Sequence, residues 1–230
     1  MSEEKKKPLS VDIYTTVRER ILSWEYPPNH HLTEAALQSE FGVSRVPVRE
    51  ALHMLEEHDL VERIPYQGCR VRQPDLKQVH ELYDMRLAIE LHVVEQLAEK
   101  GIDDSVWRDL HETWIQLYET ANEGDSTQEV PLATYDNDFH ETLARATGNK
   151  ILLNYFLEIN ERLAFVRKVD ITDLERLKST CQQHLPVLEH IRNGNAPAAR
   201  EMMRLNIETG RSNVESAIKA VLVKAFSASS

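Results

Sequence analysis

The strongest constraint on the fold is the helical spacing of apolar residues from Asp75 onward, where no segment alternates like a β-strand. Glycine, asparagine and aspartate residues interrupt this pattern at intervals and mark the ends of helices. Six helices are expected, at 75–99, 103–121, 129–146, 150–168, 172–192 and 196–225. Six helices with short connections predict one all-α domain, an antiparallel bundle.

The first 74 residues follow a different plan. Val11, Val17, Ile21 and Leu22 share one face of a first predicted helix, which ends before Pro27. A second helix follows, with Thr33 as its N-cap and Gly42 at its end, where a left-handed residue is needed. A third helix starts after Ser44, which is expected to cap it, and carries Pro47 in its first turn.

Two short strand-like stretches, Leu60–Ile64 and Cys69–Arg72, come next, with Gly68 in the turn between them. Three helices and a hairpin are the plan of a winged helix-turn-helix. The expected fold is therefore mostly α, with an N-terminal winged helix-turn-helix and a C-terminal six-helix antiparallel bundle. Pro74 and Asp75 form a plausible hinge between the two parts.

The net charge of the chain does not exclude nucleic acid as a partner, but the composition excludes a disordered or membrane-spanning protein. The net charge is −11, yet residues 1–74 carry only −2 of it and residues 75–230 carry −9. An N-terminal module with locally aimed arginines can therefore still bind a polyanion. With 41% apolar residues, two cysteines and no long apolar run, we expect an ordered cytoplasmic protein with reduced thiols and no membrane association. No secretory signal is expected in the N-terminal residues.

The third helix carries the residues expected to read DNA. Arg45 and Arg49 are four residues apart and share a face, and an arginine fork can hold guanine or a phosphate in a bidentate manner. Ser44 can donate to a phosphate at the helix N-terminus. The alternative is a solvated face on which the two arginines pair with Glu50 or Glu56.

The segment FGVSRVPVREAL, residues 41–52, resembles the recognition element of the GntR superfamily of bacterial regulators. The flanking segments YTTVRERILSWEYPP and LEEHDLVERIPYQGCRV extend this resemblance over about residues 10–72. It implies that Arg45 and Arg49 contact DNA and that the wing tip, Gln67 and Gly68, enters the minor groove. Ala35 departs from relatives that carry a further DNA-contacting arginine there, which puts part of the operator sequence in doubt.

In the predicted bundle, Asp136 and His140 are four residues apart and so lie on one helix face. A carboxylate and an imidazole on neighbouring turns can bind one metal ion. From the spacing alone, a surface pair or a core histidine satisfied by its neighbour is favoured over a metal site. His184 strengthens the metal interpretation only if the fold brings its helix close.

The bundle resembles the all-helical ligand-binding (FCD) domain of FadR-type GntR regulators. The resemblance rests on MRLAIE at 85–90, YDNDFH at 135–140, ATGN at 146–149, CQQHLPVLEHIRNGN around His184 and NAPAAREMMRLNIE before Thr209. Six helices instead of seven indicate the VanR-like branch. The resemblance implies a divalent-metal site formed by Asp136, His140, His184 and, in place of a family histidine, Asn206.

An amide oxygen is a weaker and harder ligand than imidazole, so Asn206 would lower the affinity for zinc or nickel and comparatively favour manganese. Two outcomes are open: a weakened metal site or a metal-free polar pocket. Arg86 has two possible roles, an ion pair with Glu90 or bidentate binding of a carboxylate effector, and the sequence does not decide between them. Arg162 is a weaker candidate for binding the effector.

The expected organisation is a disordered tail (1–9), a winged helix-turn-helix DNA-binding domain (10–73), a hinge (74–75) and an effector-binding and dimerisation domain (76–226). The expected function is a homodimeric regulator, a repressor by resemblance, that binds a pseudo-palindromic operator and responds to a small organic acid beside a metal of the zinc, nickel or manganese type. One alternative is a metal-free sensor of a larger ligand such as an acyl-CoA. Another is a metal-dependent hydrolase, against which stand the DNA module and the lack of a dedicated general base.

Overall fold

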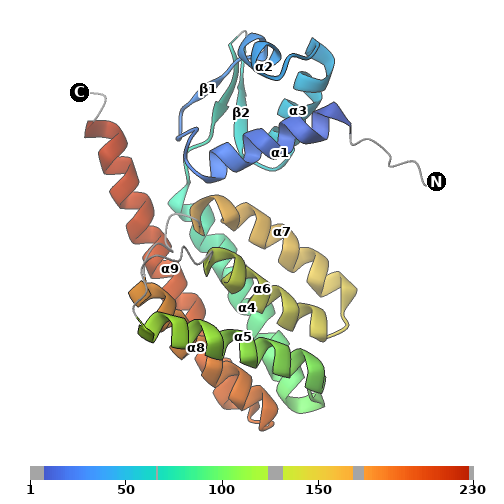
Figure 1. Ribbon diagram of the computed structural model, residues 1–230, viewed down its shortest axis with the longest axis vertical. Coiled ribbons are helices and arrows are strands. Elements are labelled where there is room, and N and C mark those ends of the chain that lie inside the picture. Colours follow the sequence, from blue (N-terminus) through green and yellow to red (C-terminus); the bar gives the residue numbers. More distant parts are fainter. Residues whose placement is uncertain (1–7, 66, 124–131, 168–173, 228–230) are drawn as a thin grey trace, which may run out of the picture. The chain divides into compact units, whose positions relative to one another are not determined.

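The computed structural model describes residues 8–65, 67–123, 132–167 and 174–227. The chain forms two compact units that divide between Asp75 and Leu76 (Figure 1). Each unit has its own core, and each is described separately below. No helix in the described ranges combines the length and apolar character that crossing a lipid bilayer requires.

The first unit is a winged helix-turn-helix, as predicted. Its helices are α1 (Leu9–Leu22), α2 (Glu34–Phe41) and α3 (Arg45–Glu57). Its strands are β1 (His31–Leu32), β2 (Val61–Ile64) and β3 (Gly68–Val71), which form an antiparallel sheet in the order β1-β3-β2. Helix α1 already begins at Leu9, within the span predicted to be a tail, and residues 1–7 of that span lie outside the described residues.

Of the helix ends predicted in the first unit, those of α2 are confirmed and the capping of α3 is not. The Thr33 side chain accepts a hydrogen bond from the Ala36 amide at 3.2 Å, which caps α2. Gly42 ends that helix in the left-handed conformation, with φ +64°. Ser44 occupies the N-cap position of α3, but its hydroxyl makes no capping hydrogen bond, contrary to the prediction.

The core of this unit lies between α1 and α3. Ile13, Val17 and Ile21 of α1 are buried, and the inner face of α3 is equally apolar, with Val48, Ala51, Leu52 and Leu55 buried. Val11, which we predicted to be on the apolar face of α1, is only half-buried, and Ile13 takes the core position. The pairing of α1 with α3 fixes the direction in which the outer face of α3 points.

Strand β1 was not predicted. It contributes only two residues, which pair with β3 in the register His31↔Arg70 and Leu32↔Cys69. A segment this short cannot show the alternation by which a strand is recognised in a sequence. Its presence explains a glycine, because a Cβ atom on Gly68, at φ +91°, would lie 2.5 Å from the carbonyl oxygen of Leu32.

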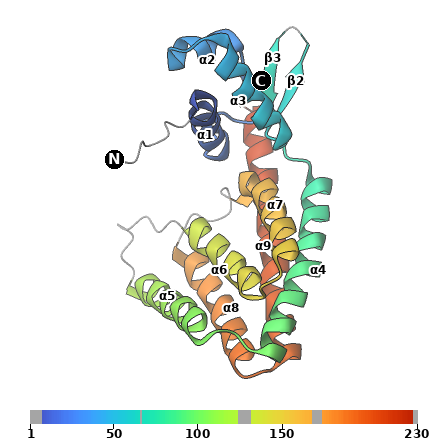
Figure 2. The ribbon, with the colours of Figure 1, turned by 90° about the vertical axis from the view of Figure 1, so that its right-hand side faces the viewer.

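The second unit is the predicted six-helix bundle (Figure 2). Its helices are α4 (Leu76–Lys100), α5 (Asp104–Glu123), α6 (Leu132–Ala146), α7 (Lys150–Arg167), α8 (Leu174–Arg192) and α9 (Ala196–Ser227). Their ends agree closely with the predicted ranges, although the predicted positions 129–131, 168 and 172–173 lie outside the described residues. Asn149 caps α7, as expected, by accepting from the Leu152 amide at 3.1 Å.

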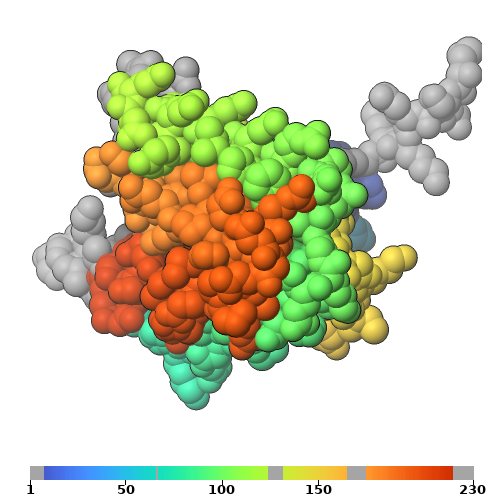
Figure 3. Space-filling view, turned by 90° about the horizontal axis from the view of Figure 1, so that it is seen from below, coloured from blue at the N-terminus to red at the C-terminus, as the bar shows by residue number. Residues whose placement is uncertain are grey.

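Helix α8 packs against α4, α5 and α9, and helix α6 packs against α4 and α7. Figure 3 shows the end of this unit where the α4–α5 and α8–α9 connections meet. There Arg192 forms an ion pair with Asp104, and the indole nitrogen of Trp107 donates to the carbonyl oxygen of Leu188 at 3.1 Å. Cys69 in the first unit and Cys181 in the second are buried free thiols.

Candidate functional site

The outer face of α3 carries two exposed arginines at its N-terminal end. The Arg45 and Arg49 side chains are 68% and 60% exposed, as a DNA-reading role requires. Both guanidinium groups are paired with a carboxylate on α2: Arg45 Nε contacts Glu34 Oε2, and Arg49 Nε lies 3.6 Å from Glu34 Oε1. Glu34 is therefore the counter-ion of these arginines, in place of the Glu50 or Glu56 considered from the sequence.

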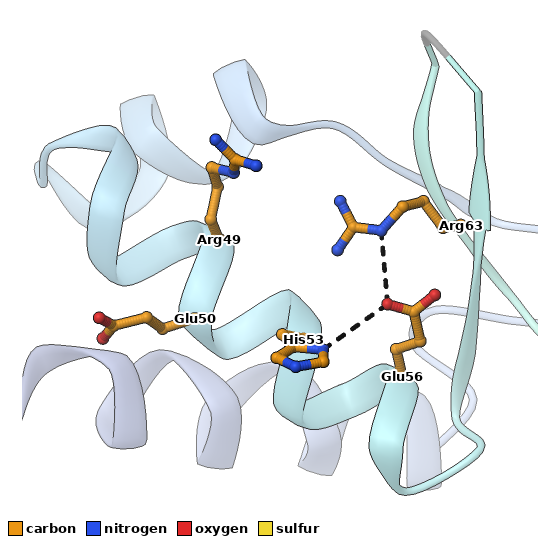
Figure 4. Close-up of a pocket in the computed structure, with 5 residues that line it drawn as sticks. All are labelled: Arg49, Glu50, His53, Glu56 and Arg63. Atoms are coloured by element: carbon orange, nitrogen blue, oxygen red, sulfur yellow. Dashed lines mark hydrogen bonds and ion pairs between the residues drawn. The ribbon is translucent and has the colours of Figure 1, made fainter.

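A cleft of about 450 Å³ opens between α3 and strand β2 of the wing (Figure 4). In this view Arg63 directs its guanidinium group from β2 toward α3, whereas the Arg49 side chain extends upward from α3. Glu56 bridges the two sides, since its Oε2 lies 3.4 Å from Arg63 Nε and 3.8 Å from His53 Nδ1. Sequence reasoning missed Arg63 and His53; the outward position of Arg63 in the alternation of β2 was the available signal.

The wing places Gln67 and Gly68 at the turn of the hairpin. Gln67 is exposed, and its backbone N–H donates to the carbonyl oxygen of Ile64 at 3.1 Å. The wing arginines that follow are already paired: Arg70 Nε donates to Glu62 at 2.9 Å, and Arg72 lies 2.9 Å from Asp59. Like Arg63, which pairs with Glu56, these wing arginines are each held by a carboxylate.

The second unit brings together the three side chains predicted to bind a metal. Asp136 and His140 on α6 and His184 on α8 are buried, and each offers a ligand atom within 4.8 Å of the others. Asp136 Oδ1 lies 3.3 Å from His184 Nε2 and 3.8 Å from His140 Nε2. The fold thus supplies the condition that the sequence left open, namely that the His184 side chain on α8 comes within reach of Asp136 and His140 on α6.

Aromatic packing fixes the position of His184. Its ring stacks on Phe139 with centroids 3.8 Å apart and an interplanar angle of 7°. Trp114 of α5 meets the same imidazole edge-on, with centroids 4.2 Å apart. A histidine enclosed in this way has little rotamer freedom, so its Nε2 atom stays directed toward Asp136.

Asn206, the fourth predicted ligand, lies buried on α9. Its Nδ2 atom donates to Gln183 Oε1 at 2.9 Å, and Gln183 is the immediate neighbour of His184. An amide that uses its nitrogen in this way keeps its oxygen available as an acceptor or ligand. Arg162, the second residue predicted to bind a carboxylate effector, lies half-buried on α7.

Arg86 and Glu90 of α4 complete the buried polar cluster. Arg86 Nε donates to Glu90 Oε1 at 2.6 Å, and Glu90 Oε2 contacts His140 Nδ1, with all three side chains no more than 3% exposed. Burial alone would raise the pKa of Glu90, but the positive charge of Arg86 and the contacts with Arg86 and His140 outweigh it and lower the pKa to about 2. Glu90 is therefore a carboxylate at neutral pH.

Arg86 combines the two interpretations that the sequence left open. It forms the ion pair with Glu90, yet within the described ranges its Nη2 atom is buried without a hydrogen-bond partner. A buried guanidinium N–H without an acceptor carries a desolvation penalty that an anionic ligand would relieve. The same side chain can thus hold Glu90 with one nitrogen and a ligand with another.

The donor set fits a divalent metal ion. One carboxylate and two imidazoles are the ligand types that zinc, nickel and manganese share. Ligands about 2.1 Å from one ion lie roughly 3.0–3.4 Å from one another. The Asp136–His184 distance of 3.3 Å falls in this range, and the Asp136–His140 distance of 3.8 Å is slightly longer. The formal charges of Arg86, Glu90 and Asp136 sum to −1 with neutral histidines, which favours a cation at this position.

Comparison with known proteins agrees with both units. Residues 9–71 match the family described as "Bacterial regulatory proteins, gntR family", and residues 81–209 match the FCD domain. An uncharacterized HTH-type transcriptional regulator of Bacillus subtilis, YdhC, is 27% identical over 201 residues, which cover 86% of this chain and 87% of that protein. The gluconate operon transcriptional repressor of the same species is 32% identical over 152 residues, covering 64% of this chain and 58% of that protein.

Among solved structures, Escherichia coli McbR/YncC has the same fold, with a TM-score of 0.69 at 18% identity, covering 90% of this chain and 97% of that chain. The families and relatives are transcriptional regulators and not enzymes, which removes the hydrolase alternative. The GntR domain implies DNA binding, and the FCD domain implies a small-molecule effector. The chain is therefore a GntR-family transcriptional regulator with a C-terminal FCD domain.

Proposed function

We propose that this regulator is a repressor whose operator affinity is controlled by a small monocarboxylate, which binds at Arg86 beside a divalent metal held by Asp136, His140 and His184. The observation that carries the proposal is the buried Nη2 atom of Arg86, which has no hydrogen-bond partner among the described residues and belongs to a cluster that also offers three candidate metal ligands. Arg162 is a second candidate contact for the effector. Assignment to the VanR-like branch and a cytoplasmic location go with this proposal.

The charge balance of the cluster indicates the class of effector. Without ligands the buried charges of Arg86, Glu90 and Asp136 sum to −1. A divalent cation changes this sum to +1, and one carboxylate then brings it to zero. Since a net charge in a buried site is costly, a monoanion is favoured over a dianion or a neutral ligand.

In the DNA-binding unit, Ser44, Arg45 and Arg49 are the proposed contacts of α3, and Gln67 and Gly68 are those of the wing. The exposure of the two arginines supports contacts with bases or phosphates. The Ser44 hydroxyl does not cap α3 and can therefore donate to a phosphate. Two copies of this unit in a homodimer would read the halves of a pseudo-palindrome. The effector then acts by binding one arrangement of the dimer more tightly than another.

The alternative is a metal-free pocket for a larger ligand such as an acyl-CoA. It is favoured by the Asn206–Gln183 hydrogen bond, which gives Asn206 a structural role that needs no metal. The two versions differ in one measurable requirement. Only the first predicts that the response to an effector is lost when divalent metal is removed.

The test is a fluorescence-anisotropy titration of the full chain with a DNA duplex that the protein itself selects from a random pool. Acetate, lactate and gluconate are added with and without MnCl₂; gluconate is included because one relative is named for a gluconate operon. We expect at least one of them to weaken DNA binding by about 5-fold or more, and only when manganese is present.

The matched variants are Arg86→Lys, which keeps the charge but removes the guanidinium fork, and Arg145→Lys, the same change on an exposed residue of α6. Arg86→Lys should reduce the response and Arg145→Lys should retain it. A response that needs no metal would favour the alternative pocket. No response to any of these acids, with or without metal, would contradict the proposed effector class.

A further inference from the structure

Glu90 occupies the centre of a buried chain of contacts that links Arg86 to the candidate metal ligand His140. One carboxylate oxygen, Oε1, accepts from Arg86 Nε at 2.6 Å, and the other, Oε2, contacts His140 Nδ1. Neither Oε2 nor Nδ1 has another hydrogen-bond partner in the part of the chain that the structure describes. The two oxygens of Glu90 therefore have separate tasks.

The contact with Glu90 determines which nitrogen of His140 carries the proton. A carboxylate is an acceptor only, so the Nδ1 atom that faces it must be the protonated nitrogen of a neutral imidazole. The lone pair is then on Nε2, which is the atom that faces Asp136 Oδ1 at 3.8 Å. The nitrogen of His140 that can bind a metal ion therefore faces Asp136, another candidate ligand.

Arg86 keeps Glu90 in this role. A guanidinium group can only donate hydrogen bonds and stays charged. Arg86 therefore donates to one oxygen of Glu90 and stabilises its carboxylate form. Asp136 lies on the Nε2 side of His140, and the same Asp136 oxygen contacts His184, the remaining titratable group of the cluster. Glu90 therefore acts on the imidazole from the side opposite to these ligands.

We infer that Glu90 is a positioning residue, which fixes His140 as the Nδ1–H tautomer so that Nε2 can bind the metal. This inference rests on the metal site of the proposed function. It assigns Glu90 a role outside the ligand set, beyond its ion pair with Arg86. It also predicts how the site fails when the carboxylate becomes an amide.

In Glu90→Gln the side chain has one oxygen and one NH₂ group. Because Arg86 can only donate, the oxygen turns to Arg86 and the NH₂ group faces His140. An NH₂ group facing Nδ1 requires that Nδ1 be unprotonated, so the proton moves to Nε2. The Nε2 atom then has no lone pair with which to bind the metal. The amide variant should thus reverse the tautomer without changing the size of the side chain.

The first readout needs no metal. Two-bond ¹H–¹⁵N correlation spectra of the metal-free full chain report the tautomer of each histidine, and the His140 signals are identified as those lost in His140→Gln. We expect a neutral Nδ1–H imidazole in the wild type and the Nε2–H form in Glu90→Gln. An Nε2–H imidazole or an imidazolium at His140 in the wild type at pH 7.5 would overturn the inference, and this measurement does not depend on how any variant folds.

The second readout is the dissociation constant for Mn²⁺ and Zn²⁺, measured by calorimetry. Loss of an outer partner of a ligating histidine typically weakens metal binding 10–100-fold, and we expect a loss in this range for Glu90→Gln. The control is Glu95→Gln on the same helix, which removes an ion pair with Arg200 but touches no candidate ligand. Its affinity should match the wild type.

The outcomes separate this inference from the proposed function. A reversed tautomer in Glu90→Gln with unchanged metal affinity would show that Glu90 does not position the ligand, even though the metal site exists. A wild-type protein that binds neither metal would contradict the proposed metal site. In that event the spectra still decide whether Glu90 orients His140.

Discussion

The Oε1 atom of Glu34 lies 3.6 Å from the Nε atom of Arg49, so a carboxylate of α2 stands against an arginine proposed to contact DNA. The same carboxylate also contacts Arg45. DNA phosphates or base edges must compete with Glu34 for these groups. This arrangement restrains binding to arbitrary DNA and gives a first prediction.

Glu34→Gln should strengthen binding to a duplex of unrelated sequence about 2- to 5-fold, because exposed pairs of this kind contribute roughly 0.2–1 kcal/mol each. Anisotropy titrations at several salt concentrations measure the effect, which should shrink as salt increases. Glu25→Gln, the same charge change at an exposed pair with Arg20, is the control. Equal effects of the two variants would mean that Glu34 acts only through net charge.

Arg49→Ala should weaken binding to the selected duplex by about 1–3 kcal/mol and leave the fold intact, because the side chain is 60% exposed. Arg145→Ala, an exposed arginine of the second unit, should bind as the wild type does. Anisotropy gives both affinities, and circular dichroism checks the fold. Unchanged affinity in Arg49→Ala would refute the assignment of α3 as the recognition helix.

Gly68→Ala tests the contact between the wing and β1. The new Cβ atom would lie 2.5 Å from the Leu32 carbonyl oxygen in a left-handed conformation, whereas Gly42→Ala adds a Cβ at φ +64° with no atom within 4 Å. The conformation alone costs about 1–2 kcal/mol, so both variants should lose stability and Gly68→Ala clearly more. Thermal denaturation compares them. Equal losses would show that β1 does not hold the wing in place.

Asn206→His should tighten the binding of Zn²⁺ by about 10-fold or more, since an imidazole is a better ligand for this ion than an amide. Calorimetry on the full chain measures the change. Asn154→His places a new histidine on an exposed face of α7, so it controls for added histidine content. If both variants bind zinc equally well, Asn206 lies out of reach of the ion.

The fold was largely predictable because its signals are local. Thr33 and Gly42 mark the ends of α2 by their own chemistry, and the helices of the bundle follow from apolar spacing. Strand β1 was missed because two residues carry no period, and only pairing with β3 defines it. For the same reason Gly68 was predicted only to bring the wing close to DNA, and its close approach to Leu32 was missed.

The candidate site was predictable only within single helices. The spacing of Asp136 and His140 places them on one face, and the spacing of Arg86 and Glu90 indicates their ion pair. The contact between Glu90 and His140 joins α4 to α6, and Glu34 reaches Arg45 from a different helix. Contacts of this kind depend on tertiary packing, which neither periodicity nor residue spacing encodes.

The central claim is that the bundle holds a metal ion, and the most direct test is the metal content of the purified protein. The full chain is isolated without chelator and without a metal-affinity column, and its metals are measured by elemental analysis. His140→Ala is analysed in parallel, with His92→Ala, an exposed histidine of α4, as the control. We predict about one divalent metal per chain in the wild type and in His92→Ala, and a loss of this metal in His140→Ala. A wild-type protein without metal, or a metal that His140→Ala retains, would contradict the account.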